Sequence, residues 1–271
     1  MKLIVTALTT RIRKRNKSLS QVRLINENES RAYLIHYSCE SFVDIKDGKT
    51  PRITSIAIRN LSSAQTESFS IHQVAELLSI PLDSISEHYD QLEKKMLADF
   101  YNYIQSKDSA TWIHWNMRDT NYGFTAIEHR YRILNGSPFR ISEDHKFDLS
   151  RALVDIYGIN YISHPRLENI VKKNNMSKIS FLTGANEAAA FQGSKFIEMH
   201  KSTLRKVDIF ENIFRRIVDN TLKVNTSWFE QRGLTFFSFF NYLKNHWFIT
   251  FIISLGTISG IGYKIFKIFH G

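Results

Sequence analysis

A run of 17 residues near the end of the chain, 247–263 (WFITFIISLGTISGIGY), contains no charged side chain. Lysines flank it on both sides: Lys244, Lys264 and Lys267. As an α-helix rising about 1.5 Å per residue, the run almost crosses a hydrocarbon core of ~30 Å, and snorkelling lysines and the apolar residues up to 266 supply the remaining length. Trp247 and Tyr263 stand where interfacial aromatic side chains belong. We interpret residues 247–266 as a transmembrane helix, with a buried core helix as the alternative.

Small residues gather on one side of this predicted helix. Gly256 and Gly260 are four positions apart, and Ser259 and Gly262 lie close to them in the sequence. Small side chains at this spacing let two membrane helices approach each other closely. The pattern predicts self-association through these four residues, and hence a homo-oligomer or a larger regulatory complex.

The segment before the run is expected to connect the membrane helix to the rest of the chain. Residues 234–243 (LTFFSFFNYL) are apolar, but ten residues make a helix of only about 15 Å, which is too short to cross a bilayer. We expect them to lie at the membrane interface or to form a re-entrant arm. Residues 223–246 are therefore interpreted as a linker followed by an interfacial aromatic segment.

The distribution of charge bears on the orientation of the chain. Its net charge is +10, and a basic cluster at residues 11–17 follows the short apolar run MKLIVTALTT instead of preceding it. A secretory signal has its charges first and a longer apolar region. We therefore expect a single-pass protein of the bacterial inner membrane with its main domain in the cytoplasm. Anionic inner-membrane lipids and nucleic acid, including a nucleoprotein, are the partners that a basic chain at this location predicts.

The composition is that of a folded protein. Hydrophobic residues make up 43% of the chain and there are only four prolines, which argues for a globular rather than a disordered chain. The single cysteine, Cys39, excludes an intrachain disulfide and a multi-cysteine zinc site. We expect a basic N-terminal arm at residues 1–30 and one soluble domain at residues 31–222.

Hydrophobic periodicity predicts that strands come first and then alternate with helices, which is typical of an α/β arrangement around a mixed sheet. In the last helix Leu204, Val207 and Phe210 fall on one face, whereas Arg205 and Lys206 fall largely on the others. The expected strands are 31–36, 52–60, 67–71 and 111–115. The expected helices are 70–80, 82–105, 122–134, 148–157, 165–174, 187–200 and 203–222.

Several of these segments resemble a known family. The runs YLIHYSCES and PRITSIAIRNLSSAQTESFSI resemble the opening of the DEDD-type 3′–5′ exonucleases of the ribonuclease-H-like fold. TWIHWNMRDTNYGFTAIEHRY is similar to the second motif of that family, and TLRKVDIFENIF to its final helix. The resemblance covers residues 31–222 and implies a ribonuclease-H-like mixed sheet flanked by helices.

The resemblance also implies a metal site. Exonucleases of this family use four carboxylates to hold two Mg²⁺ or Mn²⁺ ions ~4 Å apart, together with a His or Tyr as general base. Carried over by position, it implies Glu40, Asp119 and Asp208 as the remaining metal ligands and catalytic carboxylates. Ser38 stands where the first Asp belongs and Thr203 where the base belongs, and neither side chain can take that role. We therefore expect a catalytically degraded nuclease domain, with an active enzyme built on the three carboxylates as the alternative.

A basic group follows the second motif. Arg130, Arg132 and Arg140 are candidates for contacts with nucleic-acid phosphates, and a solvated protein surface is the commoner explanation of such a group.

Three functions are compatible with these features. The first is a membrane effector, whose nuclease-like domain senses or binds a partner and whose terminal segment self-associates to perturb the inner membrane. This architecture resembles effectors of bacterial anti-phage abortive-infection systems, including those linked to retrons and cyclic-nucleotide signalling. The second is a membrane-tethered metal-dependent exonuclease. The third is a scaffold that holds nucleic acid or a nucleoprotein at the membrane without cutting it. The glycine-containing membrane segment and the incomplete carboxylate set favour the first.

Overall fold

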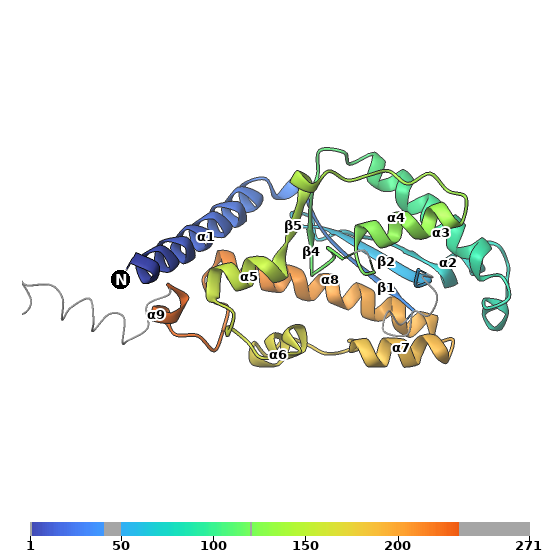
Figure 1. The fold of residues 1–271 in the computed structure, drawn as a ribbon. Helices are drawn as coiled ribbons and strands as arrows, with labels where there is room; N and C mark the ends of the chain where they lie inside the picture. Colours follow the sequence, from blue (N-terminus) through green and yellow to red (C-terminus); the bar gives the residue numbers. More distant parts are fainter. Residues whose placement is uncertain (1, 41–49, 120, 233–271) are drawn as a thin grey trace, which may run out of the picture.

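A five-stranded mixed sheet forms the centre of the structure, a computed structural model that describes residues 2–40, 50–119 and 121–232 (Figure 1). The strand order is β3-β2-β1-β4-β5, in which β2 is antiparallel to both of its neighbours, β1 and β3, and β4 and β5 are parallel to β1. This confirms the α/β class and the mixed sheet, and the order is consistent with a ribonuclease-H-like fold. The strands are β1 (Ala32–Cys39), β2 (Ile53–Asn60), β3 (Thr66–Ser70), β4 (Thr111–His114) and β5 (Lys146–Asp148).

The central strand β1 is covered on both faces, which explains why its sequence is nearly devoid of charge. Ile35 and Tyr37 belong to the hydrophobic core on one face of the sheet, and Leu34 belongs to the core on the other. His36 and Ser38 share the face of Leu34 because side chains alternate along a strand. The second half of β1 therefore places two polar side chains inside the molecule.

Three helices cover the first face (Figure 1). The longest, α3, places Leu92, Met96 and Phe100 in this core at helical spacing, as expected from the sequence. Trp112 of β4 packs into the same core. The helices are α2 (Ile71–Leu77), α3 (Tyr89–Gln105) and α4 (Phe124–Ile133).

The second face is covered chiefly by α8, which crosses β1 and β2 and buries Phe210 and Phe214 completely. Helices α5 and α6 complete this core, and α7 packs against α8 (Figure 1). The helices of this side are α5 (Leu149–Tyr157), α6 (Arg166–Lys173), α7 (Gly184–Gln192), α8 (Phe196–Val218) and the short α9 (Trp228–Gln231). Single turns of 3₁₀-helix occur at Glu29–Arg31, Leu82–Ser84 and Glu143–His145.

The basic N-terminal region forms the long helix α1 (Lys2–Glu27). It packs on α5 and α8, and Val22 and Ile25 are buried in the second core. The Arg11 guanidinium donates hydrogen bonds to the carbonyls of Val154 (3.0 Å) and Asp155 (2.6 Å) near the end of α5. Residues expected as an arm outside the domain thus contribute to its core.

Three further differences from the expected elements have local causes. Strand β5 was not expected, because three residues carry too little pattern and the strand forms through parallel pairing with β4. The helix expected at 82–105 begins only at Tyr89, after a 3₁₀ turn. The break expected near residue 201 lies instead at Gly193 and Ser194, where Ser194 has a φ of 55°, and α8 runs without interruption through Lys201.

None of the helices within residues 2–40, 50–119 and 121–232 is long and apolar enough to cross a membrane. The predicted membrane helix 247–266, its small residues Gly256, Ser259, Gly260 and Gly262, and the segment 234–243 all lie outside the described residues.

The packing of α1 gives a testable expectation. Val22 is 2% exposed and Leu24, two residues later, is 60% exposed. Val22→Asp buries an unpaired carboxylate in the second core and should lower the free energy of unfolding by about 3 kcal/mol or more. Leu24→Asp should change it by less than about 0.5 kcal/mol. Urea denaturation of both variants makes the comparison, and equal effects would show that α1 does not pack on the domain.

Candidate functional site

The face of β1 that meets α8 carries a buried polar cluster where the resemblance places the first metal-binding carboxylate. Ser38 Oγ lies 2.8 Å from Glu187 Oε1 of α7 and 2.8 Å from Thr203 Oγ1 of α8. Ser202 Oγ donates to the same Glu187 oxygen at 3.1 Å. The Thr203 hydroxyl also donates to the carbonyl of Met199. Three elements, β1, α7 and α8, thus meet around one carboxylate.

A lysine supplies the positive charge in this cluster. Lys206 Nζ lies 2.7 Å from Glu187 Oε1, and the exposed fractions of the two side chains are 6% and 13%. The sequence predicts that Lys206 lies on a polar face of its helix. In the structure its side chain is buried, because α8 lies between the sheet and α7 and has a wide buried face. Removal of a buried charge from its partner is costly, so this ion pair is held firmly. An ammonium group therefore lies near the position that the resemblance assigns to metal ions.

His36 extends the cluster toward the centre of β1. Its Nδ1 lies 3.2 Å from the Tyr122 hydroxyl, and its ring packs edge-on against Phe210. Its Nε2 is buried and has no hydrogen-bond partner among the described residues. Burial lowers the pKa of His36 well below its usual value, and the charge of Lys206 lowers it further. The imidazole is therefore neutral at physiological pH, next to a charged lysine.

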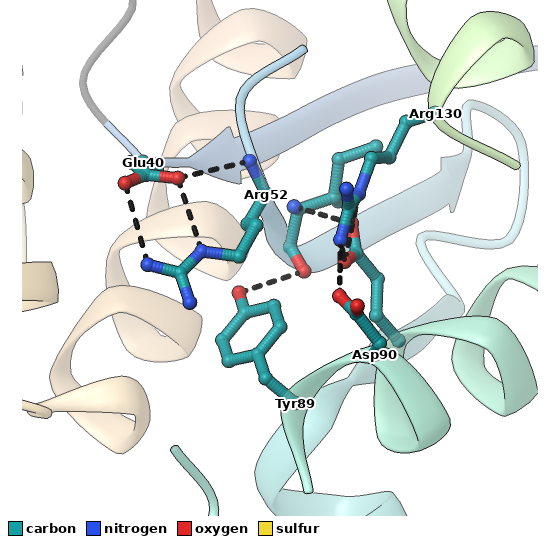
Figure 2. A network of polar contacts seen from close by, with 7 residues as sticks. Glu40, Arg52, Tyr89, Asp90 and Arg130 are labelled. Carbon is teal, nitrogen blue, oxygen red and sulfur yellow. Dashed lines mark hydrogen bonds and ion pairs between the residues drawn. The ribbon is translucent and has the colours of Figure 1, made fainter. Parts of the chain in front are cut away.

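Glu40, one of the three candidate carboxylates, is paired with an arginine (Figure 2). Its Oε2 accepts hydrogen bonds from Arg52 Nε at 3.1 Å and from the Arg52 backbone N–H at 3.3 Å. The Arg52 guanidinium in turn lies over the rings of Tyr89 and Phe191, 4.9 and 5.0 Å from their centroids. The negative charge of Glu40 is thus neutralised within the protein.

Asp119 lies in the exposed turn that follows β4. Its Oδ1 accepts a hydrogen bond from the Asn121 N–H at 2.8 Å, and its own N–H donates to the Tyr122 carbonyl at 3.2 Å. The neighbouring Asn116 has a φ of 56° and donates its N–H to Asp148 Oδ1. These contacts give the carboxylate of Asp119 a role in shaping the turn.

Asp208 is on α8 and forms ion pairs with Arg59 (3.2 Å) and Arg205 (3.4 Å). Arg59 is the register partner of Leu34, six residues before Glu40 along β1. At about 3.3 Å per strand residue, Asp208 and Glu40 meet the sheet about 20 Å apart. The side chain of α8 that faces Ser38 is Thr203, not Asp208.

Asp208 and Glu40 therefore do not meet at a common point. Two metal ions ~4 Å apart need ligands around a common point. In the described part of the chain, no group of three or more His, Cys, Asp or Glu side chains is placed to hold a metal ion. The residues around Ser38 contain one carboxylate, a lysine and hydroxyl groups, a set that does not fit Mg²⁺ or Mn²⁺.

The candidate phosphate-binding arginines differ in their surroundings. Arg130 binds the fully buried Glu93 through Nε and Nη2 and reaches Asp90 at 2.6 Å (Figure 2). Burial raises the pKa of Glu93 to about 7, while Arg130 opposes the rise. Arg130 thus ties α4 to α3 and is occupied inside the protein. Arg132 and Arg140 are exposed, and Arg132 lies 3.4 Å from Glu128.

Comparison with known proteins adds no assignment, since no family model, no curated protein and no solved structure matches the chain. The fold and the cluster define it as an α/β protein with a ribonuclease-H-like strand order, in which an internal ion pair lies beside Ser38.

Sequence reasoning missed the partners that complete this cluster. Glu187 and Lys206 are 19 residues apart in the sequence and on different helices, so no spacing rule connects them. One signal was present for Lys206, because it lies three positions after Thr203 and four before Phe210, on a common helical face.

The Lys206–Glu187 pair predicts an asymmetric effect of substitution. Lys206→Met leaves the Glu187 carboxylate without its cation and should lower the free energy of unfolding by about 3 kcal/mol. The double variant Lys206→Met/Glu187→Gln removes both charges and should recover more than half of that loss. Lys201→Met, at an exposed position of the same helix, serves as the control. Chemical denaturation measures all three, and a double variant no more stable than Lys206→Met would contradict the pairing.

The buried His114 of β4 predicts a pH dependence. Its Nδ1 accepts a hydrogen bond from the Met117 N–H at 3.1 Å, and burial lowers its pKa to about 4. Because an unfolded histidine titrates near 6.5, the contribution of His114 to the free energy of unfolding is intact above that pH. It is lost as the pH falls toward 4. Between pH 7 and pH 5 it should decrease by about 2 kcal/mol.

The variant His114→Asn keeps an acceptor but does not titrate, so its stability should fall less steeply with acid than that of the wild type. His129→Asn, at an exposed position, should retain the wild-type slope. Denaturation curves at several pH values test this, and identical slopes for wild type and His114→Asn would show that His114 is not held neutral.

Proposed function

We propose that the chain is a membrane-anchored effector of bacterial anti-phage defence. In this proposal the ribonuclease-H-like domain binds or senses a partner, and the C-terminal segment self-associates to perturb the inner membrane. The domain lies in the cytoplasm, and the partner includes inner-membrane lipid and a further copy of the chain or a regulatory complex.

The observation that carries the proposal is the ion pair near Ser38. A nuclease of the family that the sequence resembles needs an anionic site, formed by carboxylates, that metal ions can occupy. Here the buried Lys206 pairs with Glu187, and the hydroxyl groups of Ser38 and Ser202 donate hydrogen bonds to the same carboxylate. Such a cluster stabilises the packing of β1, α7 and α8, which suits a domain that binds a partner.

The sequence after α9 gives the second line of support. Residues 233–271 continue from this helix and include the uncharged run with Gly256 and Gly260. A helix with small residues at this spacing is suited to association with further copies in a bilayer. The alternative, a membrane-tethered exonuclease using Mg²⁺ or Mn²⁺ with Glu40, Asp119 and Asp208, is supported only by the strand order.

Expression of the full chain in a bacterium tests the proposal, with growth and entry of a membrane-impermeant dye as readouts. Dye entry with the full chain, and none with a chain that ends at Gly233, is the expected result. Toxicity without dye entry would contradict the proposed action on the membrane. Trimming of a 3′ end that needs Mg²⁺ or Mn²⁺ and is lost in Asp119→Ala would establish the exonuclease instead.

The small residues give a sharper test. Gly256→Ile/Gly260→Ile adds bulk to the predicted contact face and should reduce dye entry at least about tenfold, since close packing of the helices would be lost. Thr250→Ile/Ser254→Ile adds the same kind of bulk at the same four-residue spacing on the other side of the predicted helix and is the matched control. Dye entry and membrane association are measured for both variants. Equal dye entry in the two would count against close packing of the helices as the cause of the membrane damage.

A further inference from the structure

Three arginines line a groove of about 400 Å³ between α1 and the end of α8. Arg15 and Arg23 come from α1, and Arg232 follows α9, which lies beside the N-terminal half of α1 (Figure 1). One acidic residue, Glu27, also lines the groove. We refer to this site as the arginine groove.

The cations of the arginine groove have no acidic partner within the described residues. None of the three forms an ion pair there, and the Nε of Arg15 is buried without a hydrogen-bond partner. The pKa of Arg15 is lowered chiefly by burial and further by the positive charge of Arg232. Like charges are therefore held close together around a groove, which is the arrangement expected of an anion-binding site.

A second arginine-rich groove on the other side of α8 shows the contrast. It is lined by Arg59, Arg205 and Arg215 among others, and each of these arginines pairs with a carboxylate, Asp208 or Glu211. Arg216 also lines this groove and its side chain bonds only to Asn212 among the described residues, but the other three arginines are neutralised by carboxylates of the groove itself. The arginine groove lacks such pairs, so its charge is available to a ligand.

Exposed aromatic residues adjoin the arginine groove. The guanidinium of Arg232 lies 3.8 Å from the centroid of the Trp228 ring. Trp228 is 55% exposed and the adjacent Phe229 is 45% exposed. Arginine beside exposed Trp and Phe is the combination found where proteins meet lipid headgroups.

We propose that the arginine groove binds the phosphate group of an anionic phospholipid. The chemistry of the groove requires only a phosphate, and the choice of a lipid rests on the membrane attachment under Proposed function. At most ~50 Å of extended chain connects Arg232 to the predicted span beginning at residue 247, which keeps the groove near the bilayer. Residues 2–26 of α1 contain seven basic and no acidic residues, so the surrounding field also favours an anionic leaflet.

Nucleic acid is the less suitable ligand for this groove. A nucleic-acid strand is usually bound along a track of several phosphate contacts. The three arginines converge on a single recess instead, and the aromatic rings beside them adjoin the chain that leads into the apolar segment 234–243. This geometry is suited to one headgroup.

The test uses the purified full chain in neutral detergent micelles, and measures its melting temperature with added short-chain phosphatidylglycerol or phosphatidylcholine. Phosphatidylglycerol should raise the melting temperature of the wild type, and phosphatidylcholine should not, because a ligand that binds only the folded state stabilises it. Each cation near an anionic headgroup strengthens binding about fivefold. Arg15→Gln/Arg232→Gln should therefore bind phosphatidylglycerol about thirtyfold more weakly.

Two control variants separate the groove from general charge and from folding. Arg13→Gln/Lys17→Gln removes two exposed cations from α1 and should keep the wild-type response. Arg23→Gln removes one exposed cation from the groove itself and should weaken binding about fivefold. Without lipid, Arg15→Gln/Arg232→Gln should melt no lower than the wild type, because substitution relieves like-charge repulsion.

The inference is overturned if the groove variants respond to phosphatidylglycerol like the wild type, or if Arg13→Gln/Lys17→Gln loses the response equally. It is also overturned if inorganic phosphate, or a single-stranded oligonucleotide, gives the same stabilisation as the lipid. Extraction of the full chain from liposomes by carbonate tests the membrane span separately. A chain that is extracted, yet is stabilised by phosphatidylglycerol through the groove, would refute the span and leave the lipid site intact.

Discussion

The burial of β1 on both faces is the constraint on which the rest of the structure depends. A strand in this position must find an apolar cover on each side and a partner for every polar side chain. Ile35 and Tyr37 meet the first requirement on the side of α3, and Leu34 does so on the side of α8. His36 and Ser38 create the second: α7 and α8 supply the partners of Ser38, Tyr122 supplies one for His36 Nδ1, and His36 Nε2 has none among the described residues.

The contacts of Ser38 differ from those that the resemblance to DEDD-type exonucleases implies for this position. A carboxylate at that position would repel Glu187 and attract a divalent cation. With a serine there, the lysine of α8 can approach Glu187, and the serine hydroxyl completes the coordination of the carboxylate. The Ser38 hydroxyl and the buried lysine are thus compatible with each other around the Glu187 carboxylate.

The elements with a strong repeating pattern could be predicted from the sequence, and the contacts between them could not. Strands β1 and β2 lie within a few positions of their expected bounds, and helix α3 ends at its expected residue although it begins later than expected. The interpretation of residues 1–30 missed helix α1, because charged residues interrupt its apolar positions and burial comes from packing on α5 and α8. For the site, Ser38, Glu40 and Asp119 could be placed at strand ends from the order of elements. The separation of Asp208 from Glu40 depends on the register of α8 along β1, which no local pattern specifies.

The polar features of the domain fall into two kinds, and the difference follows from their location. Near Ser38 and around Arg130, charges are buried deeply and each finds an opposite charge, because an unpaired charge there would cost several kcal/mol. Around Arg15 and Arg232 water still reaches the groove, so uncompensated cations are tolerated at a smaller cost. An anion bound from outside would offset this cost. In the proposal that the arginine groove binds a phospholipid, the phosphate group of an anionic leaflet is that anion, since such a leaflet supplies phosphate groups to any cation held against it.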